Sequence, residues 1–344
     1  MIRDPIERLR WQRGGFVDRP FLTRMTAPEV VDVSIRGYQA LAWTFLRHTI
    51  VPTLFCVAAW LFVFHYLGTL FNTKETEPWK QAGELTIKLA MSLGVALPIF
   101  LIGVSWSTAV ITSLASDWIL DRVPNGNAAA SRALQLLPKM TSGITRLVLT
   151  ALGACLVSLL LLFVSQLIPD NSSTGYTGLI AALAIFGLII GGLIALYVAI
   201  IHSLVPAIIV MEGIKPSQAG KRSRSLLSST DSRRQNPAQA SILLLLLVVS
   251  FSAVATWAAW STFEGLANLS EGLRNWMAGS VINTLAVSAF QLVPVFLVLW
   301  LVMPIWSLGT VATYYATRIR IEGYDIDLLT AEVAQQDKRA RFEI

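Results

Sequence analysis

The densest group of charged side chains lies near the C-terminus, in the stretch RIRIEGYD at 318–325. Arg318 and Glu322 stand four residues apart, so on a helix they would share one face and form an ion pair. Gly323 suits the end of that helix. With Arg320 and Asp325, these residues are candidates for a cytoplasmic latch or for a site that binds phosphate, lipid or a partner. An ordinary helix end anchored by cations explains the same pattern.

A second basic group, KRSR at 221–224, follows the apolar run 179–211, which contains no Asp, Glu, Lys or Arg. Arg222 and Arg224 are candidates for binding an anionic lipid headgroup or a charged partner. The alternative is that cations gather here only because the chain leaves a membrane on its cytoplasmic side.

Polar candidates inside the apolar runs are His202 and Gln291. Polar side chains in lipid commonly face a cavity or a neighbouring helix. No charged residue lies mid-span to complete a proton relay with His202. The sequence also lacks GxSxG, HExxH and paired carboxylates in a span or external loop, and Cys56 and Cys155 stand alone. We therefore expect a protein that is not an enzyme and that has no cofactor and no metal.

The composition indicates a membrane protein. Hydrophobic residues make up 54% of the 344 residues and charged residues only 14%, against about 25% charged residues in soluble proteins. The net charge of +6 would suit nucleic acid, but the cations cluster beside apolar runs, as expected for contact with anionic lipid. We therefore expect membrane lipids with anionic headgroups as partners, together with a membrane protein as a second partner class, and no nucleic acid.

The fold class predicted is all-α, a polytopic transmembrane helical bundle. A helix needs about 20 apolar residues to cross the hydrocarbon core. Six runs are long enough: 49–71, 89–116, 147–168, 179–211, 241–261 and 281–317. The second, fourth and sixth runs are long and contain proline, namely Pro98, Pro206, and Pro294 with Pro304, so these helices should tilt, extend or kink at proline. Gln291 and Pro294 interrupt the last run, so a seventh half-span is the alternative topology.

The distribution of cations predicts the orientation. Of the 27 Lys and Arg, 23 lie in the segments 1–48, 117–146, 212–240 and 318–344. The positive-inside rule then places both termini in the cytoplasm. The predicted organisation is a cytoplasmic segment at 1–27, a membrane domain at 28–326 and a cytoplasmic tail at 327–344.

A spacing of eight residues between a proline and an arginine occurs three times, at Pro28/Arg36, Pro124/Arg132 and Pro216/Arg224. The pattern predicts three units, 28–120, 124–213 and 216–326, each a basic amphipathic segment followed by a helical hairpin. Chance is a competing explanation. Such a segment can lie in the membrane interface with its apolar face toward lipid, as for Tyr38, Leu41, Ala42 and Phe45.

Two patches, IVMEGIKPSQAGKRSRSLL at 209–227 and TYYATRIRIEGYDIDLL at 313–329, resemble a bacterial family of uncharacterised integral membrane proteins. That family is related to the membrane domain found beside glycerophosphoryl diester phosphodiesterases. The matching positions are Glu212, Gly213, Arg222, Ser223, Tyr314, Tyr315, Arg318, Arg320, Glu322, Gly323 and Asp325. The resemblance covers about residues 30–330 and implies an all-helical bundle without a known activity. The phosphodiesterase chemistry belongs to a separate soluble domain and is not implied here.

Three functions follow as hypotheses. The first is a non-enzymatic membrane protein that organises lipid or a partner protein at the cytoplasmic face. The second is a transporter or channel for a lipid or small amphiphile, and the third, least supported, is an intramembrane enzyme. A polar cavity touching His202 and Gln291 would favour transport, whereas a solidly packed apolar centre would favour the first hypothesis.

Overall fold

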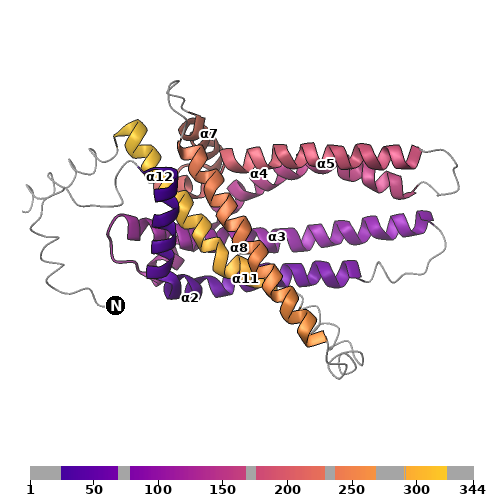
Figure 1. Cartoon of the computed structure of the whole chain (residues 1–344), viewed down its shortest axis with the longest axis horizontal. Coiled ribbons are helices and arrows are strands. Elements are labelled where there is room, and N and C mark those ends of the chain that lie inside the picture. The colour runs from indigo at the N-terminus through magenta and orange to yellow at the C-terminus, as the bar shows by residue number, and fades with distance from the viewer. Residues whose placement is uncertain are drawn as a thin grey trace, which may run out of the picture.

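The computed structural model describes residues 25–68, 78–167, 176–228, 237–268, 290 and 292–323. Within these ranges the regular secondary structure is entirely helical (Figure 1). Five helical stretches are long and apolar enough to cross a membrane: Ala27–Val63, Gly94–Ile119, Ala182–Glu212, Ala238–Phe263 and Val293–Glu322. The all-α prediction is therefore confirmed, and five long apolar helices fit a multi-pass membrane protein.

The helices, in chain order, are α2 (Ala27–Gly68), α3 (Pro78–Ile119), α4 (Gly126–Leu167), α5 (Tyr176–Ile201), α6 (Val205–Glu212), α7 (Pro216–Ser228), α8 (Pro237–Asn268), α11 (Val293–Leu297), the π-helical turn η1 (Val298–Val302) and α12 (Met303–Glu322). Neighbouring helices pack along one another: α2 on α3, α3 on α4, and α4 on α5. Helix α12 packs against α2, α3 and α8. The predicted run 147–168 lies almost entirely in α4, and the count of six spans remains a prediction.

Prolines break some of these helices and not others. The apolar run 179–211 divides into α5 and α6 at the turn His202–Leu204, and Pro206 occupies the first turn of α6. Of the three outcomes expected for the long spans (tilt, extension or a kink at proline), this run shows a break next to Pro206, whereas α3 (Pro78–Ile119) continues unbroken through Pro98. The last run begins at Val293 with Pro294 in its first turn, then continues through η1 to Glu322. The half-span proposed before it falls outside the described residues and is untested.

The basic amphipathic segments differ from the prediction. In α2 and α4 the segment continues into the following apolar run as one unbroken helix of 42 residues, and only α7 is a separate helix. The apolar face expected in lipid instead packs inside the protein: Phe45 is fully buried, and Tyr38 and Leu41 pack partly buried against the same core. The interfacial placement of this face was wrong because another helix, rather than lipid, covers it.

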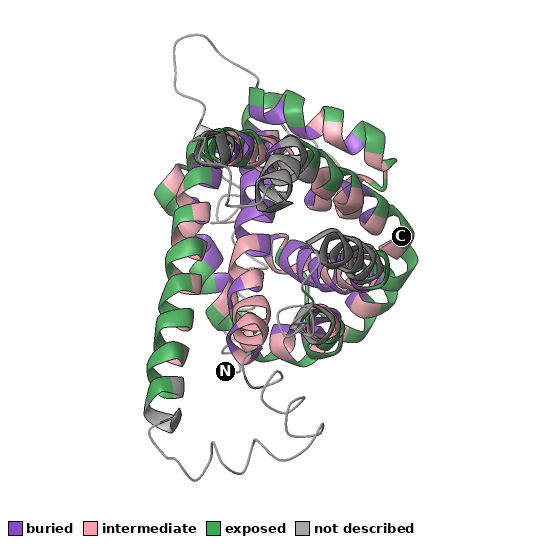
Figure 2. Ribbon diagram, turned by 90° about the vertical axis from the view of Figure 1, so that its right-hand side faces the viewer, coloured by how far each residue is buried: buried purple, intermediate pink, exposed green. Residues whose placement is uncertain are grey.

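One hydrophobic core joins α2, α3, α4, α6, α7, α8 and α12. Its largest fully buried side chains include Ile111 and Leu114 of α3, Ile208 of α6 and Tyr314 of α12. Figure 2 shows buried residues where helices face one another and exposed residues on the outer sides. The outer sides of α5 and α8 carry many exposed large apolar side chains, as expected for surfaces that face lipid.

Candidate functional site

Two helices end in the same dipeptide, Glu-Gly. Gly213 after α6 and Gly323 after α12 both adopt the left-handed conformation, with φ of 66° and 64°, which glycine adopts without steric cost. The expected helix end at Gly323 is confirmed. Glu212 and Glu322 therefore lie in the last turns of their helices, next to the negative ends of the helix dipoles. A carboxylate in that position needs a nearby cation to offset the repulsion.

Two arginines supply that charge. Arg318 Nε donates to Glu322 Oε2 at 2.8 Å, which confirms the predicted i,i+4 pair. Arg222 of α7 reaches both acids, with its Nε 3.5 Å from Glu212 Oε1 and its Nη2 in contact with Glu322 Oε1. Tyr314 Oη donates to Glu212 Oε1 at 2.9 Å and accepts from Arg318 Nη1 at 3.1 Å. These five side chains form one charged network.

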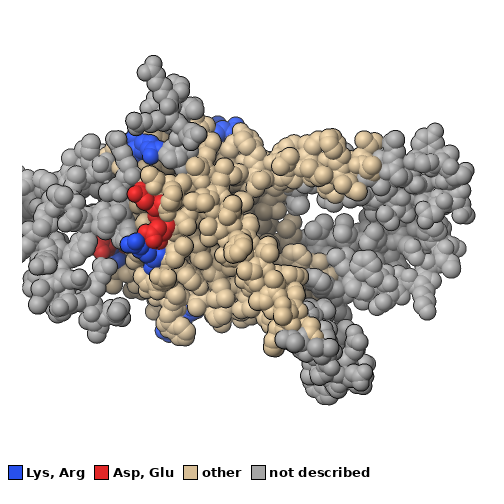
Figure 3. Space-filling model, in the orientation of Figure 1, with Lys and Arg blue, Asp and Glu red and all other residues tan. Residues whose placement is uncertain are grey.

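The charged network connects α6, α7 and α12 and is electrically neutral, with two arginines and two glutamates. Its charged side chains are only 19–33% exposed. Figure 3 shows acidic and basic atoms side by side at one end of the described surface, whereas the surface beside them is tan. Each arginine already has a carboxylate partner, so the arrangement resembles a latch between helices more than a binding site for phosphate.

The second tyrosine of the pair, Tyr315, extends this connection to α3. Its hydroxyl donates to Met211 Sδ at 3.4 Å and lies 2.9 Å from Ser116 Oγ. Both tyrosines are almost fully buried. Six of the motif residues that suggested a family resemblance therefore connect helix ends in this structure: Glu212, Arg222, Tyr314, Tyr315, Arg318 and Glu322.

A different group of cations surrounds a cavity of about 370 Å³ between α4, α7 and the turn that ends α5. Its lining includes Arg146, Lys221, Arg224 and His202, and none of the described residues that line it is acidic. The full lining is Gly143, Arg146, Leu147, Thr150, Val198, His202, Val205, Pro216, Ser217, Gly220, Lys221 and Arg224. We call this space the cationic cavity.

His202 is held in place by the end of α5. Its Nδ1–H donates to the Val198 carbonyl oxygen at 2.9 Å, which leaves Nε2 as the nitrogen available to a ligand. Gly220 of α7 packs beside the ring, and a Cβ there would lie 3.4 Å from His202 Cδ2. This is an ordinary van der Waals distance, so α7 lies directly against the histidine ring.

The geometry of α7 explains why Arg222 and Arg224 have different surroundings. Residues that are two positions apart in an α-helix point in directions about 200° apart around the helix axis. The side chains of Arg222 and Arg224 therefore point to different sides of α7. Ser217, Gly220, Lys221 and Arg224 recur at helical spacing and line the cationic cavity, whereas Arg222 joins the charged network. Sequence reasoning grouped the two arginines because they are near neighbours. The helical period of 216–228 was the signal that could have separated them.

Between those two arginines, Ser223 faces the protein core. It is fully buried, and its Oγ donates to the Ile201 carbonyl oxygen at 2.6 Å, where the end of α5 leaves carbonyl groups without helical partners.

Replacing Ser223 with alanine should therefore lower the free energy of unfolding by about 1–2 kcal/mol, since it leaves that buried carbonyl unsatisfied. Ser225→Ala is the matched control, because Ser225 is exposed and bonds only to the Arg222 carbonyl in its own helix. Thermal unfolding of both variants in detergent measures the difference. Equal melting temperatures would show that Ser223 does not stabilise the break between α5 and α6.

The remaining candidates are placed as follows. Arg320 is exposed on α12. Gln291 and Asp325 lie outside the described residues. Sequence reasoning missed Arg146 as a member of a site, since Arg146 belongs to α4 and lies about 70 residues before the start of α7 in the chain.

Comparison with known proteins gives no relative from which a role could be transferred: no family model, curated protein or solved structure matches this chain. The resemblance carried by the two sequence patches therefore remains a hypothesis.

Proposed function

We propose that this chain is a non-enzymatic, six-span protein of the bacterial inner membrane, with both termini in the cytoplasm, that binds the anionic headgroup of a lipid in the cationic cavity. It would thereby organise lipid at the cytoplasmic face. The observation that carries the proposal is the lining of this cavity, which among the residues that the structure describes has three cations, one histidine and no acidic residue.

Phosphate is the group that best fits this chemistry. Guanidinium and ammonium groups donate several hydrogen bonds to phosphate oxygens, and Arg146, Lys221 and Arg224 approach the cavity from two helices. The Ser217 hydroxyl adds a donor on α7, whereas the Thr150 hydroxyl already donates to the Arg146 carbonyl oxygen at 2.7 Å. Cations near the cytoplasmic surface of a membrane attract anionic lipid. The neighbouring helix α5 exposes apolar side chains, which suit contact with lipid.

A transporter for a lipid or small amphiphile is the second candidate. One observation favours it: His202 lies at the break between α5 and α6 and lines a cavity, and transporters commonly place their sites at broken helices. Transfer of fluorescent lipid between the leaflets of proteoliposomes would support transport. Retention of lipid without transfer would support the organising role.

Native mass spectrometry of the full chain in mild detergent, with added phosphatidylglycerol, tests the proposal. The variant Arg146→Gln/Lys221→Gln/Arg224→Gln should retain about tenfold less lipid than the unmodified protein, because it removes every cation of the cavity. The control Arg47→Gln/Arg122→Gln/Arg132→Gln makes the same change in net charge at exposed positions outside the cavity and should retain lipid normally. Equal retention by all three proteins would refute headgroup binding at this cavity.

A further inference from the structure

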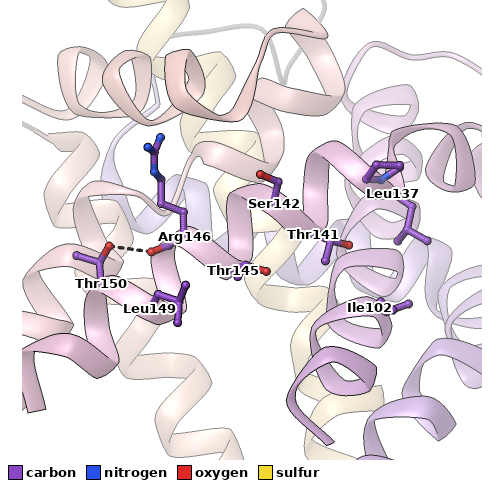
Figure 4. Close-up of a pocket in the computed structure, with 9 residues that line it drawn as sticks. Ile102, Leu137, Thr141, Ser142, Thr145, Arg146, Leu149 and Thr150 are labelled. Carbon is purple, nitrogen blue, oxygen red and sulfur yellow. Dashed lines mark hydrogen bonds between the residues drawn. The ribbon is translucent and has the colours of Figure 1, made fainter. Parts of the chain in front are cut away.

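A larger groove of about 790 Å³ runs between α3 and α4, next to the cationic cavity. Figure 4 shows its lining, with Arg146 and Thr150 toward one end and Ile102 and Leu137 toward the other. Arg146 and Thr150 also line the cationic cavity. The two spaces are therefore adjacent around α4 and share the same arginine.

The groove combines apolar walls with a few hydroxyls. Ile102, Leu137, Pro138 and Leu149 supply hydrocarbon, and Ile102 and Leu149 are 40% and 57% exposed, so the groove opens on the outer side of the helices. Thr141, Ser142 and Thr145 add hydroxyls from α4. The Thr141 Oγ1 atom is buried and has no hydrogen-bond partner in the described structure.

We propose that this groove holds an acyl chain of the phospholipid whose phosphate occupies the cationic cavity. The inference rests on the proposed function and specifies its ligand as a chain-bearing phospholipid rather than a free phosphate. Arg146 lines both spaces and therefore lies where phosphate and glycerol would meet. The apolar walls would exclude water from the acyl chain. A soluble phosphate has no hydrocarbon for such walls to contact.

Two probes distinguish a phospholipid from a soluble phosphate compound as the ligand. Phosphatidylglycerol carries headgroup and chains, and glycerol 3-phosphate carries the headgroup chemistry alone. The variant Ser142→Phe fills the groove from an exposed position, so the side chain need not displace the core. Leu134→Phe is the control, because Leu134 is exposed on the same helix and lines neither space.

In native mass spectrometry, Ser142→Phe should retain phosphatidylglycerol at least about tenfold less well than Leu134→Phe, since each buried methylene contributes about fourfold in affinity. Calorimetric binding of glycerol 3-phosphate should be the same in both variants. Thermal unfolding of each variant confirms that it is folded.

The outcomes distinguish the two proposals. Equal retention of phosphatidylglycerol by Ser142→Phe and Leu134→Phe, with loss in the triple glutamine variant, would overturn the groove and leave headgroup binding standing. If the triple glutamine variant retained as much phosphatidylglycerol as the unmodified protein, headgroup binding itself would be overturned. Weaker binding of both phosphatidylglycerol and glycerol 3-phosphate by Ser142→Phe would also overturn the inference, because the groove would then not be specific to the acyl chain.

Discussion

Replacing Gly103 with alanine is expected to destabilise the protein, whereas the same replacement at Gly94 on the same helix is expected to be neutral or stabilising. At Gly103, α3 comes very close to α2. A Cβ there would lie 2.6 Å from Cys56 Sγ and 2.7 Å from the Pro52 carbonyl oxygen. The second of these is a backbone atom, so the clash cannot be relieved by rotating a side chain. One or both helices would have to shift.

The expected cost at Gly103 is about 1–3 kcal/mol in the free energy of unfolding, the usual range for overpacking a tight interior contact. At Gly94 an added Cβ would meet nothing within 4 Å. Alanine is favoured over glycine inside a helix by roughly 0.5–1 kcal/mol, so Gly94→Ala should gain part of that amount. The two variants therefore differ in the sign of the effect and not only in its size.

Thermal unfolding of both variants in the same detergent, followed by tryptophan fluorescence, measures this difference. Size-exclusion chromatography before heating confirms that each variant starts from the same folded state. A melting temperature for Gly103→Ala at or above that of Gly94→Ala would contradict the close approach of α2 and α3.

The sequence predicted the local features of this fold. Helix class follows from long apolar runs, the Arg318–Glu322 pair follows from a spacing of four, and the break near Pro206 follows from proline geometry. Each of these depends on residues within about one or two helical turns. No knowledge of the partner helix is needed to predict them.

The features that the sequence did not predict depend on distant helices. The apolar face at Phe45 was assigned to lipid because lipid and a protein core favour the same apolar side chains, so periodicity alone cannot distinguish them. The cationic cavity needs Arg146 from α4 and Lys221 from α7, which only the packing of the two helices brings together. His202 and Arg224 were separate candidates in the sequence, and the structure places both in this cavity.

Removing one arginine of the charged network should have the second large effect. Arg318→Gln leaves Glu322 at the end of α12 with one cation fewer and removes the donor to the Tyr314 hydroxyl. The expected loss is about 1–3 kcal/mol in the free energy of unfolding, below the value for a fully buried pair because the side chains are partly exposed.

A matched pair on another helix gives the control. Arg36 and Asp32 of α2 form an Arg–acid pair at the same spacing, but their side chains are 68% and 55% exposed. Arg36→Gln should therefore cost less than about 0.5 kcal/mol. Thermal unfolding compares the two variants, and native mass spectrometry should find normal phosphatidylglycerol retention in Arg318→Gln, because the network lies outside the cationic cavity. Loss of lipid from a folded Arg318→Gln protein would place headgroup binding at the network instead.

Exchanging the charges tests whether the network acts as a unit. In an isolated pair, Arg318→Glu combined with Glu322→Arg would restore the attraction that each single change removes. Here Arg222 also contacts the Glu322 carboxylate, so an arginine at position 322 would meet a second cation. The exchanged protein should therefore melt at least as low as Arg318→Gln, whereas exchanging Arg36 and Asp32 should leave the melting temperature nearly unchanged. Recovery of the original melting temperature in the exchanged α12 pair would mean that Arg222 adds nothing and that the latch between α7 and α12 does not stabilise the fold.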